Sequence, residues 1–419
     1  MERAGNAPIF LSIIPAFVSV FLQFVILRPN RIADGTGYRL LEFGPSAAAW
    51  ALLLLPLAGA LLFVVLGAPG SPAGNNSPTG KWSPTGTCSP TWRLGILALW
   101  SVTVTVLPWL LFQRGTAVLT QRGMIGELGR VTPGAGFWLL LLSALVGWHE
   151  LSRVSRASQN RSQLVFPVAA VTAFVLVALL VVQPAFRSVS YVVEYTVRSE
   201  RFIQALFEHV LLSGTAVGLA CLIGVPAGMA AYRHPRLRET ILDATSTIQT
   251  IPSLAMFGLL IAPLSTLSRA VPALRRAGVS GVGVTPALIA LTLYALLPVV
   301  RNTVTGLLVV PLEIRESGRA MGMNRRQLFR MVEVPIALPV LLGGVRTAAV
   351  QAVGNTTVAG LIGAGGLGWF VFQGLGQAAT DLVVLGVIPI VILAVLVDRL
   401  FGVLQRISNR GRVEVEVAG

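Results

Sequence analysis

Charged residues are scarce in this chain. Of its 419 residues, 12% are Asp, Glu, Lys or Arg, whereas 54% are hydrophobic. A soluble domain carries about 25% charged residues, so this chain has too few charges to cover an ordinary water-exposed surface. One large soluble core is also excluded, because the apolar residues fall into many separate runs of about 20 residues, the length that crosses a bilayer.

Acidic residues are the scarcer charge, with 17 Asp and Glu against 32 Lys and Arg, and the net charge is +15. In a soluble protein this balance would suggest a nucleic-acid partner. Here the arginines lie in short segments between apolar runs, and no RRM-like or zinc-finger pattern is present. We therefore expect contact with lipid headgroups and acidic proteins, and no nucleic acid.

Cysteine and histidine are almost absent. The two cysteines form neither a disulfide framework nor a metal-binding spacing. The three histidines belong to no metal or nucleophile motif, and His149-Glu150 lacks the second histidine of HExxH. The sequence therefore predicts no catalytic residue, no metal and no cofactor, and it gives little support to a membrane enzyme.

Nucleotide-binding motifs are absent as well. GNNSPTGKW resembles a P-loop, but five residues rather than four separate Gly74 from Gly80, and tryptophan stands where Ser or Thr should hold magnesium. GAGGLG (363–368) satisfies GxGxxG, but a spanning segment precedes it where the dinucleotide fingerprint needs a strand. We expect a re-entrant or outer-face turn with close backbone packing. Its structural glycines are Gly363, Gly365, Gly366 and Gly368.

Long apolar runs are what the sequence has in abundance, and they predict an all-α polytopic membrane protein of about ten transmembrane helices. The first run is too long for a signal-peptide core and no small-residue cleavage site follows it, so we expect a retained span. The runs lie at 9–27, 46–66, 94–112, 134–151, 164–183, 206–230, 241–262, 286–310, 336–361 and 382–404.

The character of the chain changes near residue 204. The first five runs carry few polar residues at mid-depth, whereas glycine, proline and intramembrane polar residues become frequent afterwards. Two small-xxx-small pairs, Gly214/Gly218 and Gly224/Gly228, predict close helix packing. We therefore expect an N-terminal membrane extension at 1–204 with a disordered loop at 69–92, a membrane core at 205–404 and a tail at 405–419.

A polar segment, PLEIRESGRAMGMNRRQLFRMVEVP (311–335), interrupts the core. Pro311 can begin a helix, and Gly322 tolerates the positive φ that ends one. Asn324 and Gln327 predict a capping box for a second short helix, which we expect Pro335 to end. Leu328, Met331 and Val332 share the apolar face of that helix. The sequence predicts a knob too polar to enter lipid, and the alternative is an amphipathic loop lying on the membrane.

The same segment resembles the EAA-type loop of ABC importer permeases, which reads Glu-Ala-Ala, three residues, Gly, nine residues and Ile-x-Leu-Pro. Here Glu316-Ser317-Gly318, Gly322 and Val332-Glu333-Val334-Pro335 keep that spacing. In that family the loop is the coupling helix, which inserts into a groove on a cytoplasmic ATPase. The resemblance implies ATPase coupling for Glu316, Ser317, Gly318, Gly322, Asn324, Leu328, Met331 and Pro335.

Three further segments, 248–264, 285–307 and 362–375, resemble the osmoprotectant branch of that family, which imports glycine betaine, choline and related amines. The first five spans are similar to a subgroup with an N-terminal membrane extension. Trp369 departs from relatives that carry an acidic or small residue there. The resemblance implies a five-helix type I permease core at 205–404 in the cell inner membrane. Implied partners are a cytoplasmic ATPase, a second permease chain, identical or related, and an extracytoplasmic binding protein that sets most of the selectivity.

Polar side chains at membrane depth must face protein or a wet path, and aromatic faces can stabilise a quaternary ammonium. Interhelical hydrogen bonding and interfacial anchoring are the alternatives. Arg346 either snorkels or pairs with Asp243 or Asp398. The candidates for a substrate path are Gln249, Tyr294, Gln351, Asn355, Thr356, Thr357 and Trp369.

Coupling to an ATPase requires residues 311–335 to be cytoplasmic, and ten spans then place both termini inside. The arginine bias between loops is modest. A secondary transporter is the main rival, but it should show inverted repeats and paired intramembrane charges; no repeat is visible and charge within the spans is scarce. A permease for another small amine or amino-acid-like solute, and a tension-gated channel, stay open as alternatives.

Overall fold

A computed structural model describes residues 18–19, 21–29, 34–43, 90–125, 129–157, 165–181, 187–276 and 278–409. The chain divides into two compact units, Met1–Val193 and Glu194–Gly419. The helix α6 (Ser190–Val197) crosses this boundary. The expected span at 46–66 and nearly all of the expected loop at 69–92 lie outside the described residues.

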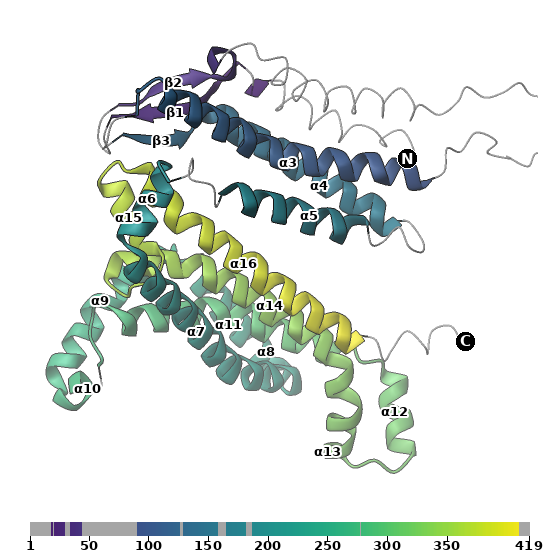
Figure 1. Ribbon diagram of the computed structural model, residues 1–419. Coiled ribbons are helices and arrows are strands. Elements are labelled where there is room, and N and C mark those ends of the chain that lie inside the picture. Colours follow the sequence, from purple (N-terminus) through teal and green to yellow (C-terminus); the bar gives the residue numbers. More distant parts are fainter. Residues whose placement is uncertain are drawn as a thin grey trace, which may run out of the picture. The chain divides into compact units, whose positions relative to one another are not determined.

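A three-stranded antiparallel sheet of order β2-β1-β3 lies in the first unit (Figure 1). Its strands are β1 (Gln23–Arg28), β2 (Thr36–Arg39) and β3 (Arg130–Pro133), and the 3-10 helix η1 (Leu40–Phe43) follows β2. Aromatic and β-branched residues in QFVILR favour a strand. The expected helical span at 9–27 is therefore wrong for its last residues, because a short apolar run fits a buried strand as well as a helix.

The described residues of the first unit also form the helices α3 (Pro90–Gln121), α4 (Ala135–Ala157) and α5 (Val165–Val181). These helices overlap the spans expected at 94–112, 134–151 and 164–183. Phe137 of α4 is fully buried, with ring centroids 5.9 Å from Phe24 of β1 and 5.6 Å from Phe112 of α3. The sheet and the first two helices therefore share one aromatic core.

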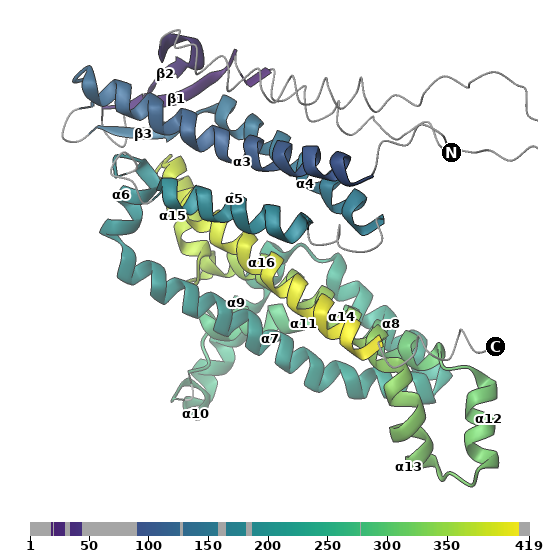
Figure 2. The ribbon, with the colours of Figure 1, turned by 45° about the vertical axis from the view of Figure 1, so that its right-hand side comes forward.

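The regular elements of the second unit are all helices among its described residues (Figures 1 and 2). Its elements are α7 (Ser199–Arg233), α8 (Pro235–Thr250), α9 (Ser253–Ala270), α10 (Pro272–Arg276), α11 (Val284–Leu308), α12 (Leu312–Ala320), α13 (Arg325–Leu328), the π-helical η4 (Phe329–Glu333), α14 (Val334–Ala359), the 3-10 helix η5 (Gly360–Ile362), α15 (Gly368–Gly376) and α16 (Thr380–Asn409).

Five segments of this unit are long and apolar enough to cross a membrane, which confirms the expected five-helix core. They are α7, α9, α11, the continuous 325–362 segment and α16. The expected span at 241–262 is corrected, because the chain breaks at Ile251–Pro252 into α8 and α9. Together with part of α3, six such helices occur in the described residues, so the count of ten is not reproduced.

Close packing of α7 on α11 depends on one of the two predicted glycine pairs. A Cβ built on Gly224 would lie 3.0 Å from Val299, and one on Gly228 would lie 2.6 Å from the Thr303 Cβ. Gly214 and Gly218 meet nothing within 4 Å. The second pair therefore lets these helices approach as predicted, whereas the first pair has no such neighbour among the residues that the structure describes.

We expect Gly228→Leu to destabilise the core by about 1–3 kcal/mol, because the new side chain would meet Thr303 and the Val300 carbonyl. Gly218→Leu on the same helix is the matched control, since open space surrounds it. Thermal unfolding of the purified chain in detergent measures the difference. Equal midpoints for the two variants would contradict the packing described here.

Candidate functional site

Residues 311–335, which we call the projecting segment, extend beyond the bundle formed by α7, α11, α14 and α16 (Figures 1 and 2). The segment comprises α12, α13 and η4. Its exposed polar surface and its position at one end of the second unit agree with the knob that the sequence predicts.

The bend between α12 and α13 is closed by hydrogen bonds at both of its sides. Gly322 has a φ of 83°, and the N–H groups of Gly322 and Met323 donate to the carbonyls of Arg319 (2.9 Å) and Gly318 (3.1 Å). This is a Schellman motif, and it needs the left-handed conformation that glycine adopts without strain. The predicted role of Gly322 in ending the first helix is confirmed.

The capping box at the start of α13 is confirmed too. Asn324 Oδ1 accepts hydrogen bonds from the N–H groups of Arg326 (3.1 Å) and Gln327 (2.9 Å), and Gln327 Oε1 accepts from the Asn324 N–H at 2.9 Å. These bonds satisfy amides that a helix start leaves unpaired. The geometry of the bend is therefore specified locally by the sequence.

The two short helices pack through a glycine and a leucine. A Cβ built on Gly318 would lie 2.7 Å from Leu328 Cδ1, and Leu328 is buried. Glu316, Ser317 and Met331 are exposed instead. The predicted coupling residues thus divide into an inner pair that sets the angle of the hairpin and an outer group that is open to a partner.

Pro335 does not end the second helix, which corrects the sequence prediction. The chain runs without interruption from α13 through η4 into α14. A π-type turn precedes the proline, and the Val334 N–H donates to the Phe329 carbonyl five residues back. Wider turns of this kind accommodate irregularities inside helices and are frequent at functional sites. The projecting segment is therefore the direct extension of a membrane-spanning helix.

Arg315 ties α12 to the membrane core. Its Nη2 donates to the Leu307 carbonyl in α11 at 2.6 Å. Its Nε lies 3.3 Å from Glu333 Oε1 in η4, an ion pair that does not have hydrogen-bond geometry. Its guanidinium carbon lies 5.5 Å from the centroid of the Tyr232 ring at the end of α7. One side chain therefore contacts three other helical elements.

In a second cation–π contact, α7 supplies the arginine and the projecting segment supplies the ring. Arg233, the last residue of α7, places its guanidinium carbon 5.5 Å from the centroid of the Phe329 ring in η4. The end of α7 and the projecting segment thus each contribute one arginine and one aromatic ring to the contacts between them. Sequence reasoning missed Arg315, Tyr232 and Arg233, because these partners are far apart in the sequence and belong to no motif.

Two candidates for the substrate path are hydrogen-bonded to the backbone where α8 breaks into α9. Gln249 Nε2 donates to the Tyr294 carbonyl at 2.7 Å, and the Tyr294 hydroxyl donates to the Ile251 carbonyl at 2.6 Å. Tyr294 is buried. The hydroxyl bond satisfies the Ile251 carbonyl at the break, and the Gln249 bond satisfies a carbonyl of α11 that lies four residues before Pro298 and so lacks its usual helical donor. Both residues therefore have a structural role.

The polar residues of α14 separate onto different faces. Thr356 is fully buried, and its hydroxyl donates to the Ala352 carbonyl of its own helix at 2.7 Å. Gln351 and Asn355 stand one turn apart on a face that is exposed or half-buried, and Gly354 beside them meets nothing within 4 Å. Thr357 is half-buried. The predicted group is therefore not brought together in one place.

The glycine-rich turn packs closely against α7, as predicted. Gly363, Gly365 and Gly366 all have positive φ, and the Gly366 N–H donates to Glu208 Oε2 at 2.8 Å. Gly368 lies against the Thr357 carbonyl with no room for a Cβ. His209, which is fully buried, lies 3.0 Å from the Val353 carbonyl through Nε2. Sequence reasoning missed Glu208 as a partner of the turn.

Residues 220–410 match the family described as the binding-protein-dependent transport system inner membrane component, and residues 4–73 match the N-terminal domain of the ABC transporter permease YehY. The osmoprotectant import permease OsmW of Salmonella typhimurium is 41% identical over 214 residues, which are 51% of this chain and 94% of that protein. The chain belongs to the osmoprotectant branch of the ABC importer permeases.

Other relatives agree. The glycine betaine/carnitine/choline permease OpuCD of Bacillus subtilis is 38% identical over 49% of this chain and 82% of its own length. The choline permease OpuBB of the same organism is 36% identical over 48% and 85%. As a permease of this family, the chain is a multi-pass inner-membrane transport subunit rather than an enzyme, and the family implies ATPase and substrate-binding protein partners.

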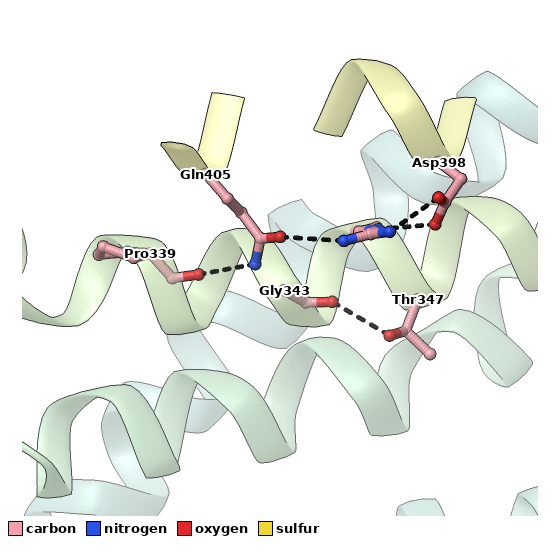
Figure 3. A network of polar contacts seen from close by, with 6 residues as sticks. Pro339, Gly343, Thr347, Asp398 and Gln405 are labelled. Carbon is pink, nitrogen blue, oxygen red and sulfur yellow. Dashed lines mark hydrogen bonds and ion pairs between the residues drawn. The ribbon is translucent and has the colours of Figure 1, made fainter. Parts of the chain in front are cut away.

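The open question about Arg346 in this permease is resolved by α16. Arg346 Nε and Nη2 donate to the two carboxylate oxygens of Asp398 at 2.6 and 2.7 Å. Figure 3 shows how Gln405 continues the network. Its Oε1 accepts from Arg346 at 3.4 Å, and its Nε2 donates to the Pro339 carbonyl at 3.0 Å. The bidentate pair therefore joins α14 to α16.

We expect Arg346→Asp and Asp398→Arg each to lower the thermal midpoint of the purified permease, because each leaves two like charges facing one another. The double exchange should recover a large part of the loss, with a coupling energy of about 0.5–3 kcal/mol. Arg406→Asp, at an exposed position in the last turn of α16, is the matched charge control. Additive losses in the double variant would show that the pair does not hold the helices together.

Proposed function

We propose that this permease imports quaternary-ammonium osmoprotectants such as glycine betaine and choline, which a separate extracytoplasmic binding protein delivers. The observation that carries the proposal is the 41% identity to a permease named for osmoprotectant import across 94% of that protein. Permeases named for choline and for glycine betaine lie at 36% and 38% identity. Another small amine or amino-acid-like solute is the second candidate.

The projecting segment is the proposed receiver of mechanical work from a cytoplasmic ATPase. Glu316, Ser317 and Met331 are exposed and available to a groove on the ATPase. Gly318, Leu328, Gly322 and Asn324 set the shape of the hairpin behind them, and Pro335 lies where it joins α14. Arg315 ties α12 to α7 and α11, and the segment continues directly into α14, so a displacement of the segment would reach three spans at once.

The proposed topology follows from this contact. If the ATPase binds the projecting segment, that end of the second unit is cytoplasmic. The end of α16 lies beside the same end in both views (Figures 1 and 2), which supports a cytoplasmic tail at 405–419. An even number of spans would place the N-terminus inside as well, with residues 1–204 as a membrane extension of the core at 205–404.

A second permease chain, identical or related, is the proposed cover for the open face of α14. Gln351 and Asn355 lie on that face, and polar side chains at membrane depth need protein or water beside them. A substrate path between two permease chains would place both protein and water beside Gln351 and Asn355. Thr356, Thr357, Gln249 and Tyr294 then stabilise the helices around that path, and the lipid bilayer surrounds the rest.

The experiment that tests the proposal is reconstitution of the permease with its ATPase and binding protein in liposomes. Labelled glycine betaine or choline should accumulate against its gradient only when ATP is hydrolysed. Vesicles containing the ATPase and binding protein without the permease provide the control. Uptake driven by an ion gradient without ATP would establish a secondary transporter, and passive flux without partners would establish a channel. ATP-driven uptake of a different solute would retain the mechanism and replace the substrate.

A further inference from the structure

A cation already lies on the face of Trp369. The guanidinium carbon of Arg201, in the first turn of α7, lies 5.4 Å from the centroid of the Trp369 ring. Cations within about 6 Å of a tryptophan face are attracted by the negative charge density of the ring. The same guanidinium forms an ion pair with Glu208, which lies about two turns further along α7; the distance between Arg201 Nη1 and Glu208 Oε1 is 3.1 Å. Arg201 therefore satisfies two groups that each attract positive charge.

The carboxylate of Glu208 is held in place without help from Arg201. Gln204 donates to its Oε1 at 2.8 Å and the Gly366 N–H donates to its Oε2 at 2.8 Å. A Cβ on Gly365 would run into this carboxylate, so the glycine turn is shaped to admit it. If the arginine swung away, a fixed negative charge would remain beside an aromatic face.

Arg201, Glu208 and Trp369 are accessible enough for another cation to replace the guanidinium. The side chains of Arg201 and Glu208 are 32% and 27% exposed, and Trp369 is half-buried. Arginine is long and flexible, with a weakly hydrated head group, so its contact with the ring can be broken and remade. A surface pair of this kind contributes little to folding.

We propose that Arg201 occupies, as a tethered stand-in, a binding site for a quaternary ammonium group formed by Trp369 and Glu208. A trimethylammonium group has no N–H to donate, so it is recognised by ring faces and by negative charge rather than by hydrogen bonds. This pair of groups supplies both. The inference deepens the proposed function, on which the identity of the natural ligand rests, and it makes Arg201 a competitor that keeps the site closed until a substrate displaces it.

The test is binding of radiolabelled choline to the purified permease alone in lipid nanodiscs. We expect Arg201→Ala to bind choline about tenfold more tightly than the parent chain, because no tethered cation has to be displaced. Adding Trp369→Leu or Glu208→Gln to that variant should remove the gain. Guanidinium chloride should compete with choline in Arg201→Ala more strongly than sodium chloride at equal ionic strength.

Arg269→Ala is the matched control, because it removes the same charge from an exposed position in the last turn of α9. Equal choline affinity of Arg201→Ala and the parent chain would overturn the proposal, and so would a gain that persists without Trp369. Should Arg201→Ala fail to fold, choline should still change the tryptophan fluorescence of the parent chain and not of Trp369→Leu; identical responses would overturn it.

These measurements need no ATPase and no transport, so they separate this inference from the proposed function. Tight choline binding without choline import would leave the site in place and remove the assigned substrate. Choline import with no effect of Arg201→Ala on binding would leave the proposed function in place and remove the site.

Discussion

The contacts of Arg315 are the interaction on which the arrangement of the core and its projecting segment depends. The residue stands in a short polar helix outside the bundle, yet its guanidinium reaches the end of α11, the ring of Tyr232 at the end of α7, and Glu333 in the turn that leads into α14. Its side chain and that of Glu333 are only 13% and 12% exposed. A charged group this shielded is stable only with its partners in place. The contacts of Arg315 therefore fix the position of the projecting segment relative to α7, α11 and α14.

Three further features connect the projecting segment and the spans to one another. The segment continues through a π-turn into α14, so no flexible linker separates the two. The glycines of α7 let it approach α11 closely, and the Arg346–Asp398 pair joins α14 to α16. A displacement at the projecting segment would therefore act on packed helices, because no loop separates the segment from α14.

Local sequence signals predicted the local geometry well. Gly322 and the Asn324/Gln327 box are contained within a few residues, and each formed as expected because capping depends on neighbours in the sequence. Run length gave the number of spans in the second unit and the approximate position of four of them. It failed at 9–27, where pairing partners convert apolar residues into strand β1, and at 241–262, where Pro252 ends a helix.

The relations between distant residues could not be predicted in this way. The contacts of Arg315, Glu208 and Arg201 include residues of other helices or turns, and no spacing in the sequence predicts those contacts. Arg346 illustrates the same limit: its charge demanded a partner, but only the packing of α14 on α16 selects Asp398 over Asp243. Gln249 and Tyr294 were predicted as path residues because they are polar or aromatic. Both hydrogen-bond to backbone carbonyls of other helical elements, which no sequence pattern indicates, and their place on a substrate path stays a prediction.

The most direct test of this account is to measure ATP hydrolysis and substrate uptake in the same vesicles for Arg315→Ala, with Arg319→Ala, an exposed arginine on the same helix, as the control. We expect the Arg315 variant to fold and to bind the ATPase, because the outer residues of the segment are intact. Uptake per ATP hydrolysed should fall by about fivefold or more, as expected for the loss of a coupling free energy of about 1–3 kcal/mol. An unchanged ratio of uptake to hydrolysis would contradict it.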